Sequence, residues 1–338
     1  MENKISVIVI TYNQENTIAR TLDSVLMQKC HLPIEIILGE DDSTDNTRKV
    51  CETYAELYPD IIRLMDKAPN KGFIDNYFDC LLACNGKYIA DCAGDDFWID
   101  DTKLEKEINL LERDHSITLV HTDWMYYNEN TGDTIYPGRN PFSTALTDGK
   151  TMLEGIVTQI TRPIIHLCTA VYRADVIKKA YNEDTFLFRN KDFGCEDLQI
   201  CFTAANSGKI AYLPDITLYY SRKEQSVSFT TDNRKQFMFV KKITDLSFYL
   251  CKKYKISTSA TDKYFKDRLF ALAMHAFRSE DASLRDNAWY CATEWHVKMP
   301  WKAFVVHGVM LNSLTWGIAL YARRLFVAAK RLKKRLAL

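Results

Sequence analysis

Short apolar runs alternate with helical patterns through the first 115 residues of this chain, and this alternation restricts the fold more than any other feature. Four runs are too short and too continuous for amphipathic helices, and we predict that they are strands. They cover residues 5–11, 34–39, 61–65 and 87–92. Strands and helices alternating at this spacing are typical of a parallel, doubly wound sheet, in which ligands bind at the carboxyl ends of the strands.

The pattern is less regular downstream of about residue 117. Further strands are expected at residues 119–127, 167–173 and 209–214, and a helix is expected to begin near Glu196. Beyond residue 235 the spacing of apolar residues predicts helices to the end of the chain.

Composition excludes several classes of protein. Lys and Arg together number 44, as do Asp and Glu, so bulk charge gives no sign of a nucleic-acid partner. The ten Cys residues contain no CxxC pair, so reduced thiols are expected rather than a zinc site. The N-terminus enters the first predicted strand directly, so no cleaved secretory signal is expected. The 338 residues, 47% of them hydrophobic, suffice for one large or two modest domains.

Polar side chains follow three of the predicted strands. They are Thr11 to Glu15, Glu40 to Asp45, and Asp95 with Asp96. If the sheet is parallel, all three groups lie along one edge, where they could hold the base, ribose and metal-bound phosphates of a nucleotide. Each group also has a structural interpretation, because these residue types commonly start helices. The Asp95–Asp96 pair alone supports both interpretations, since its carboxylates need either a cation or a helix N-terminus.

The order and spacing of these motifs resemble the inverting family 2 glycosyltransferases of bacterial type, which have the GT-A fold. The matching residues are 5–13, 18–28, 39–47, 70–72, 76, 86–90, 94–98 and 103–106. The resemblance implies an α/β fold in which helices flank a doubly wound, mixed sheet, followed by a helical C-terminal extension. It implies a nucleotide-sugar-binding half over residues 1–115, an acceptor and catalytic-base half over 116–232, and a helical region over 233–338.

The resemblance also implies which residues bind the nucleotide sugar. Their matches in this chain are Thr11, Tyr12, Asn13, Glu15, Glu40, Asp41, Asn76, Asp95 and Arg222. Asp95, with Asp96, would bind Mn²⁺ or Mg²⁺ that neutralises the leaving nucleoside diphosphate. Two positions depart from the family pattern. Ala93 stands where an acid is usual, with Asp91 two residues earlier, and Asp75 stands where a basic residue is common.

A Gly-Cys-Glu-Asp segment resembles the family's catalytic motif at a helix start. It places Asp197 where a base would take the proton of the acceptor hydroxyl, with Glu196 beside it in the catalytic centre. Helix capping is the alternative role for both acids.

Four side chains are weaker candidates. Arg222 and Lys223 either approach the diphosphate or are solvated loop charges. His166, like His121, is either a ligand or acceptor contact or a buried histidine of the core.

The resemblance therefore implies an enzyme that moves a hexosyl or N-acetylhexosaminyl group from a nucleoside-diphosphate sugar, with UDP-sugar favoured. The acceptor would be a hydroxyl of a glycan or lipid-linked saccharide in cell-surface polysaccharide synthesis. Two alternatives stay open. A nucleotide-sugar-binding protein with impaired catalysis is one, because Ala93 removes an expected acid. A sugar nucleotidyltransferase is the other, although the residues after the first strand lack its glycine-rich triphosphate loop.

The C-terminal region raises a separate question. Residues 303–322 carry no charge, and seven basic residues without an acid follow between 323 and 338. The apolar run has the length of a membrane span, but its polar interruptions fit a helix lying in the membrane surface better. We expect a cytoplasmic protein attached peripherally to the inner face of the cell membrane. A buried helix of a bundle is the alternative.

Overall fold

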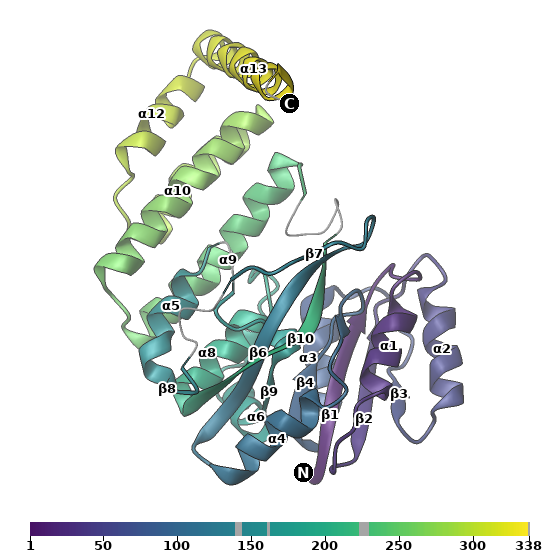
Figure 1. The fold of residues 1–338 in the computed structure, drawn as a ribbon. Helices are drawn as coiled ribbons and strands as arrows, with labels where there is room; N and C mark the ends of the chain where they lie inside the picture. Colours follow the sequence, from purple (N-terminus) through teal and green to yellow (C-terminus); the bar gives the residue numbers. More distant parts are fainter. Residues whose placement is uncertain (139–143, 161–162, 223–229, 337–338) are drawn as a thin grey trace. The chain divides into compact units, whose positions relative to one another are not determined.

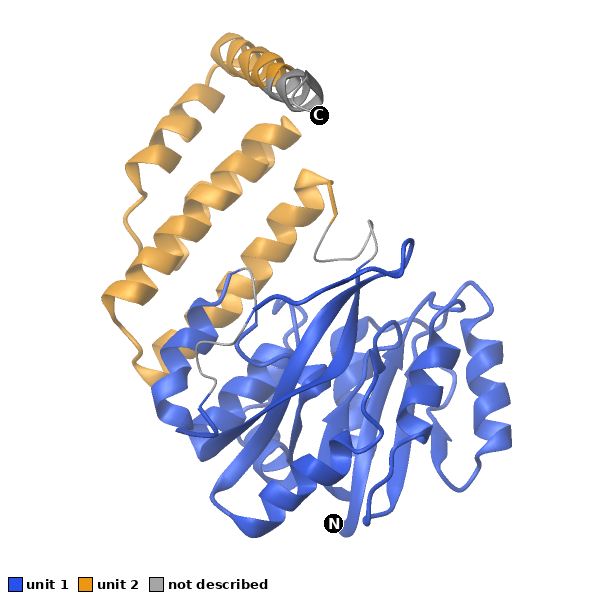
Figure 2. Cartoon of the chain, viewed as in Figure 1, with its two compact units in different colours: residues 1–223 blue, residues 224–338 orange. Residues whose placement is uncertain are grey.

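The computed structural model describes residues 1–338 except 139–143, 161–162, 223–229 and 337–338 (Figure 1). It divides into two compact units, Met1–Lys223 and Glu224–Leu338 (Figure 2). One sheet with a shared hydrophobic core runs through the first unit. The functional labels given above to three segments of the chain remain predictions.

Four parallel strands form the first half of the sheet, in the order β3-β2-β1-β4. Their bounds are β1 Glu2–Thr11, β2 Ile34–Glu40, β3 Ile62–Leu64 and β4 Gly86–Asp91. All four overlap the predicted strands, whose continuous Ile and Val runs suit strands that are buried on both faces. Thr11 pairs with Glu40 in the register of β1 and β2, so the polar residues after both strands meet at one edge.

The second half of the sheet is mixed. β9 lies antiparallel to β4 and β6, β10 runs parallel to β6, and β5 and β8 pair antiparallel with β10, as β7 does with β6. The bounds are β5 Phe97–Trp98, β6 Ile117–Asn128, β7 Thr134–Ile135, β8 Leu146–Asp148, β9 Val171–Arg173 and β10 Lys209–Arg222. The strand predicted over 167–173 is wrong in its first half. The 3-10 helix η2, Leu167–Thr169, forms there because backbone N–H groups donate to carbonyls three residues back.

Helices cover both faces of the sheet (Figure 1). The apolar stripes of three helices pack against the side of β1 that carries Ile5, Val7 and Val9. These helices are α1 Ile18–Leu26, α2 Thr47–Leu57 and α4 Lys103–Arg113. The other face is covered by α3 Phe73–Ala83, α6 Ala174–Glu183 and α8 Asp197–Ser207. Shorter helices are η1 Gly149–Met152, α5 Leu153–Thr158 and α7 Thr185–Arg189.

The second unit is helical, as the sequence predicts. Its helices are α9 Asn233–Tyr254, α10 Ser259–Ser279, α11 Ala282–Glu294, α12 Trp301–Met310 and α13 Ser313–Leu336. Thr258 and Thr261 form a capping box at the start of α10, which packs against α9, α11 and α12. The predicted fold class, a mixed α/β sheet flanked by helices and followed by a helical region, is confirmed.

Candidate active site

The acids after β2 shape the edge of the sheet. Asp41 accepts hydrogen bonds from the backbone N–H groups of Lys71 and Gly72, both at 2.9 Å, and so fixes the loop before α3. Glu40 is buried and accepts from the N–H of Ser43 at 2.6 Å. Both carboxylates lie at the predicted nucleotide edge and have backbone partners there.

The segment after β1 is bonded to the segment after β2. Asn13 has a left-handed φ of +52° and accepts from the N–H of Thr44 at 2.8 Å. Glu15 accepts from the backbone and side-chain amides of Asn46 at 2.9 and 2.7 Å. Tyr12 is 47% exposed, so its ring is available to a flat ligand such as a base. Of these three predicted contacts, Asn13 and Glu15 are bonded to the segment after β2, whereas the ring of Tyr12 is exposed.

Two other predicted contacts are built into the scaffold. The hydroxyl of Thr11 donates to Oε1 of Gln14 at 2.7 Å. Asn76 is 3% exposed and donates to the carbonyl of Gly39 at 2.8 Å. A Cβ at Gly39 would lie 2.8 Å from Oδ1 of Asn76 and 2.5 Å from Sγ of Cys80, so this position requires glycine. Thr11 and Asn76 therefore position the strand ends.

A buried polar stripe along α1, extended by Thr17 before the helix and Gln28 after it, holds the segment that carries the two adjacent Asp residues. Its members recur every three or four residues, so they share one face of the helix. Thr17, Thr21, Ser24 and Gln28 bond to backbone atoms of Gly94, Asp96, Trp98 and Asp100 at 3.0, 2.7, 3.1 and 2.7 Å, respectively. The stripe fixes the path of residues 94–100.

The two adjacent Asp residues have different surroundings. Asp96 is 1% exposed, and its Oδ1 accepts from the N–H of Ser221 at 2.9 Å. Burial, and next the Asp95 carboxylate, raise the pKa of Asp96 well above its usual range. Asp95 is partly exposed, while its carbonyl accepts from Oγ of Ser221 at 2.6 Å and from Arg20 at 3.3 Å. Asp95 thus presents the more accessible carboxylate.

This donor set fits a divalent cation of the Mg²⁺ or Mn²⁺ type. Such cations prefer carboxylate oxygens and keep coordination positions for phosphate. The turn is fixed by α1 and β10, and its two acids supply oxygen ligands next to each other. Ala93 supplies none, so a cation at this turn would have the carboxylates of Asp95 and Asp96 as its ligands.

The second pair of acids stands at the start of α8. Glu196 precedes the helix and Asp197 is its first residue. Burial is the largest cause that raises the pKa of both, with Asp197 and then Asp91 adding to the rise at Glu196, which reaches about 8. Glu196 is therefore mainly protonated at neutral pH. A carboxylate whose pKa is moved toward neutrality is better suited to general base chemistry than a solvated one.

A cavity of about 160 Å³ brings Asp96 of the first pair together with both acids of the second. Its walls come from β1, α3, the end of β4, η2, the start of α8 and β10. The lining residues are Ile8, Ile10, Tyr77, Asp91, Cys92, Ala93, Asp96, His166, Leu167, Cys168, Glu196, Asp197 and Tyr220. Of the residues predicted for catalysis, nucleotide or metal, Asp96, Glu196 and Asp197 meet here.

The four weaker candidates named from the sequence lie in different surroundings. Burial lowers the pKa of His166 and of His121 to about 4, so both are neutral at physiological pH, and His166 lines the cavity. The guanidinium of Arg222 lies 3.2 Å from the ring centroid of Tyr126. Lys223 lies outside the described residues.

Three site residues were not predicted from the sequence. Ser221 bonds to both adjacent Asp residues, and Tyr77 and Tyr220 line the cavity. They come from α3 and β10, far apart in the sequence, and nothing local marks them. The polar stripe of α1 did have a signal, because Thr21, Ser24 and Gln28 interrupt an apolar helix at helical spacing.

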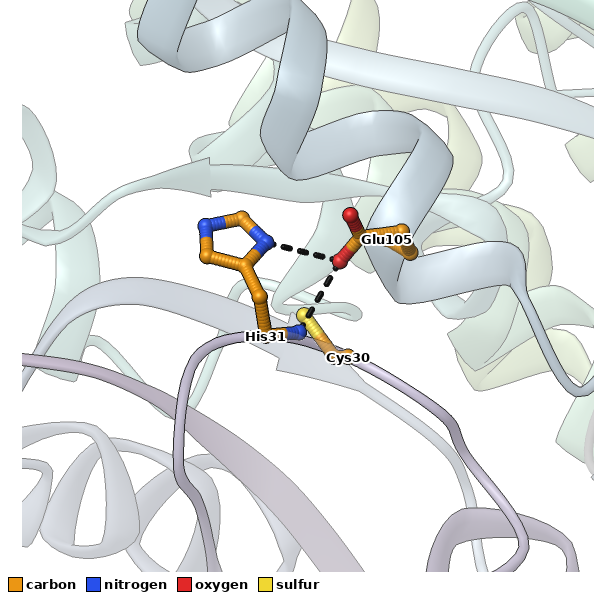
Figure 3. A group of neighbouring side chains, drawn as sticks. All are labelled: Cys30, His31 and Glu105. Carbon is orange, nitrogen blue, oxygen red and sulfur yellow. Dashed lines mark hydrogen bonds and ion pairs between the residues drawn. The ribbon is translucent and has the colours of Figure 1, made fainter.

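A separate cluster joins the loop before β2 to α4 (Figure 3). Cys30, His31 and Glu105 present ligand-type atoms within 4.8 Å of one another. The Glu105 carboxylate accepts from the backbone N–H of His31 at 3.0 Å and contacts its Nδ1 at 2.7 Å. Because His31 precedes β2 and Glu40 ends it, this cluster lies at the opposite edge of the sheet from the cavity. Its hydrogen bonds fasten the loop to the helix.

The mixed α/β sheet with helices on both faces is the architecture of the GT-A fold. The chain belongs to glycosyl transferase family 2, whose sequence profile matches residues 6–180. The family membership implied by the sequence motifs is thus confirmed.

Two relatives illustrate the range of similarity. An uncharacterised protein of Mycobacterium tuberculosis is 30% identical over 238 residues, which cover 68% of this chain and 62% of that protein. The enzyme UDP-Glc:alpha-D-GlcNAc-diphosphoundecaprenol beta-1,3-glucosyltransferase WfgD of Escherichia coli is 32% identical over 145 residues, 42% of this chain and 54% of its own. The chain thus spans less than two thirds of the length of either relative.

Solved structures share the fold. The S. aureus protein TarS in complex with UDP-GlcNAc superimposes with a TM-score of 0.54 at 17% identity, covering 93% of this chain and 92% of that one. The mannosyltransferase PcManGT from Pyrobaculum calidifontis, in complex with GDP-Man and Mn²⁺, gives 0.54 at 18% identity, covering 98% and 87%. Both cover nearly the whole chain, including the helical second unit.

Proposed function

We propose that this chain transfers a sugar from a nucleoside-diphosphate sugar, with UDP-sugar favoured, to a hydroxyl of a glycan or lipid-linked acceptor, with inversion. One observation carries the proposal: Asp96 of the acidic turn and Asp197 of α8 line the same cavity. A diphosphate bound at the turn would place its sugar in that cavity. The name of the WfgD relative, with a UDP-Glc donor and a diphosphoundecaprenol acceptor, supports these donor and acceptor classes.

The proposed chemistry needs a base beside the sugar. The acceptor oxygen forms a bond to the anomeric carbon while the bond from that carbon to the diphosphate breaks, and Asp197 takes the hydroxyl proton. Burial raises the pKa of Asp197 and so makes its carboxylate a stronger proton acceptor. Glu196, with a pKa of about 8, is mainly protonated at neutral pH and would donate a hydrogen bond instead.

Asp95 and Asp96 would hold Mn²⁺ or Mg²⁺ in this proposal. The bound cation would supply positive charge that stabilises the departing nucleoside diphosphate. The chain's own contribution is a turn whose backbone is fixed in advance by Thr21 and Ser221. Such preorganisation lowers the cost of bringing two carboxylates to one cation.

The test is Asp197→Asn, compared with Asp192→Asn on the exposed loop before α8. A thermal-shift panel of UDP-, GDP- and dTDP-sugars with Mn²⁺ first identifies the donor, because a bound ligand raises the apparent stability. Asp197→Asn should lower transfer by about 10²- to 10⁴-fold while donor affinity stays at the wild-type value. Asp192→Asn should transfer normally. Turnover near the wild-type rate in Asp197→Asn would refute the assignment of the base.

A nucleotide-sugar-binding protein with impaired catalysis is the second candidate, and Ala93 on the cavity wall favours it. Release of nucleoside diphosphate from the identified donor, measured with and without Mn²⁺ and over a panel of glycan acceptors, separates the two. Donor binding without any release under all conditions would favour the second candidate.

We also propose peripheral attachment to the cytoplasmic face of a membrane through α12 and α13. Within the described residues no single helix is long and apolar enough to cross a bilayer. Trp301–Met310 and Ser313–Phe326 together have the required length and composition, but the pair is bent by 114°. Large apolar side chains are exposed along both, namely Trp301, Phe304, Val305, Leu311, Leu314, Ile318, Tyr321, Leu325 and Phe326. Exposed apolar side chains beside basic residues suit an anionic lipid surface. Truncation after residue 300 should abolish flotation with anionic vesicles, and unchanged flotation would refute the proposal.

A further inference from the structure

Asp91, the last residue of β4, is a buried carboxylate whose acceptor positions are not filled by the described residues. It is 4% exposed, and neither of its oxygens has a partner there at full hydrogen-bond geometry. The hydroxyls of Tyr77 and Tyr172, which bond to each other at 3.0 Å, lie close enough to Asp91 to favour its charged form. A buried carboxylate with acceptor positions left open is costly, so its presence points to a ligand that would bond to it.

The position of Asp91 shows where that ligand would lie. Asp91 lines the cavity of about 160 Å³ at the end of β4. Asp96 and Asp197 line the same cavity, one from the acidic turn and the other from α8. Ala93, two residues beyond Asp91, adds only a methyl group to the wall. The volume greatly exceeds the roughly 10–15 Å³ that a single water needs, so the cavity has room for a larger polar group.

We propose that Asp91 binds a hydroxyl group of the sugar being transferred and is a specificity-determining residue. The inference rests on the proposed function, in which the anomeric carbon lies between the diphosphate at the acidic turn and the base Asp197. A sugar ring in that place occupies the cavity, and its hydroxyls are neutral donors that a carboxylate accepts. Because the proposed base Asp197 also lines this cavity, a neutral donor group suits Asp91 better than a phosphate.

A specificity role makes a prediction that a structural role does not. Asp91 should contribute to the binding of the sugar nucleotide but not of the nucleoside diphosphate alone. It should also couple to one particular hydroxyl, so that removing the residue and removing the hydroxyl have non-additive effects. Sites that bond a substrate hydroxyl discriminate strongly against analogues that lack it.

The experiment uses the full chain and the donor found by the thermal-shift panel. Calorimetry measures the affinity of this sugar nucleotide, and of the matching nucleoside diphosphate, for wild type, Asp91→Asn, Asp91→Ser and Glu107→Gln, each with Mn²⁺. Glu107 is a control for the loss of a buried carboxylate outside the cavity, because it is fully buried, pairs with Lys103 at 2.6 Å and does not line the cavity. Circular dichroism establishes that each variant is folded.

Both Asp91 variants should bind the sugar nucleotide about 10- to 100-fold more weakly and the diphosphate within twofold of wild type. Glu107→Gln should bind both normally. A deoxy analogue of the donor that lacks the hydroxyl bound by Asp91 should bind to Asp91→Asn no more weakly than the intact donor does. This analogue identifies the hydroxyl.

Three outcomes would overturn the assignment. Equal losses for sugar nucleotide and diphosphate would place Asp91 at the phosphates or the metal, and no loss for either would make it structural. If the folded wild-type protein binds the nucleoside diphosphate but no sugar nucleotide, the proposed function is refuted, and the assignment of Asp91 with it.

Discussion

Replacing Asp91 by Asn should stabilise the protein, and by more as the pH rises. Burial raises the pKa of this carboxyl from an ordinary value of 3.8 to about 7. Because the unfolded chain ionises this group first, the native state pays no penalty below about pH 4, a growing one up to about pH 7, and a constant one above it. The difference is about 3 pH units, and at about 1.4 kcal/mol per unit the full penalty is on the order of 4 kcal/mol. Asn does not ionise and avoids it.

Urea unfolding of wild type and Asp91→Asn at pH 5 and pH 8 measures this effect. The advantage of the variant should grow by about 3 kcal/mol between the two pH values, since most of the penalty develops in that interval. Asp60→Asn, at an exposed position, should show no such growth. An advantage of Asp91→Asn that is equal at both pH values would refute the reasoning, because an uncharged Asp91 has no cost that depends on pH.

Three further predictions concern the scaffold. Gly39→Ala should lower the stability by about 1–3 kcal/mol, because its Cβ would lie 2.5 Å from Sγ of Cys80, and thermal melting at an unchanged temperature would contradict this. Thr21→Val leaves the Asp96 carbonyl without its 2.7 Å bond, so we expect a loss of about 1–3 kcal/mol and weaker Mn²⁺ binding by calorimetry; normal Mn²⁺ affinity would argue against a supporting role. The bond to Glu105 raises the pKa of His31, so its stabilisation is fully present below about pH 6.5 and is lost as the pH rises through the folded pKa. His31→Asn should therefore be less stable than wild type at pH 6 and equally stable at pH 9. The difference in unfolding free energy should be less than about 1 kcal/mol, because the side chain is 43% exposed. A difference that is the same at both pH values would exclude the ion pair as its cause.

The sequence predicts the first half of the sheet well. The strands β1 to β4 are continuous apolar runs, and their parallel pairing follows from the helices between them. The polar groups after β1 and β2 could be placed at one edge for the same reason. The two-residue strand β5 could not be predicted, because its pairing partner β10 is distant in the sequence. The 3-10 helix η2 is held by local bonds, but its residues also suit a strand, so the sequence did not distinguish the two.

The site was only partly predictable, because a sequence motif gives the residue types at a site but not the direction in which each side chain points. Asn76 fits a ligand-binding pattern but is bonded to Gly39. The sequence shows Asp91 only as an acid displaced from the usual position, whereas its burial and its open acceptor positions depend on packing between β4, α3 and β9. Ser221 joins the site through β10, more than a hundred residues from the turn that it supports.

The polar stripe of α1 holds the acidic turn almost entirely by its main chain, through carbonyls and amides between Gly94 and Asp100. Main-chain atoms are the same for every amino acid, so the support does not depend on which side chains the turn carries. Substitutions there can alter the chemistry of the turn while its backbone path is kept. Ala93 in place of an acid is one such change, because the turn keeps its bonds to α1. The same separation makes residues 93 and 95 suitable positions for redesigning metal or donor preference with little risk to folding.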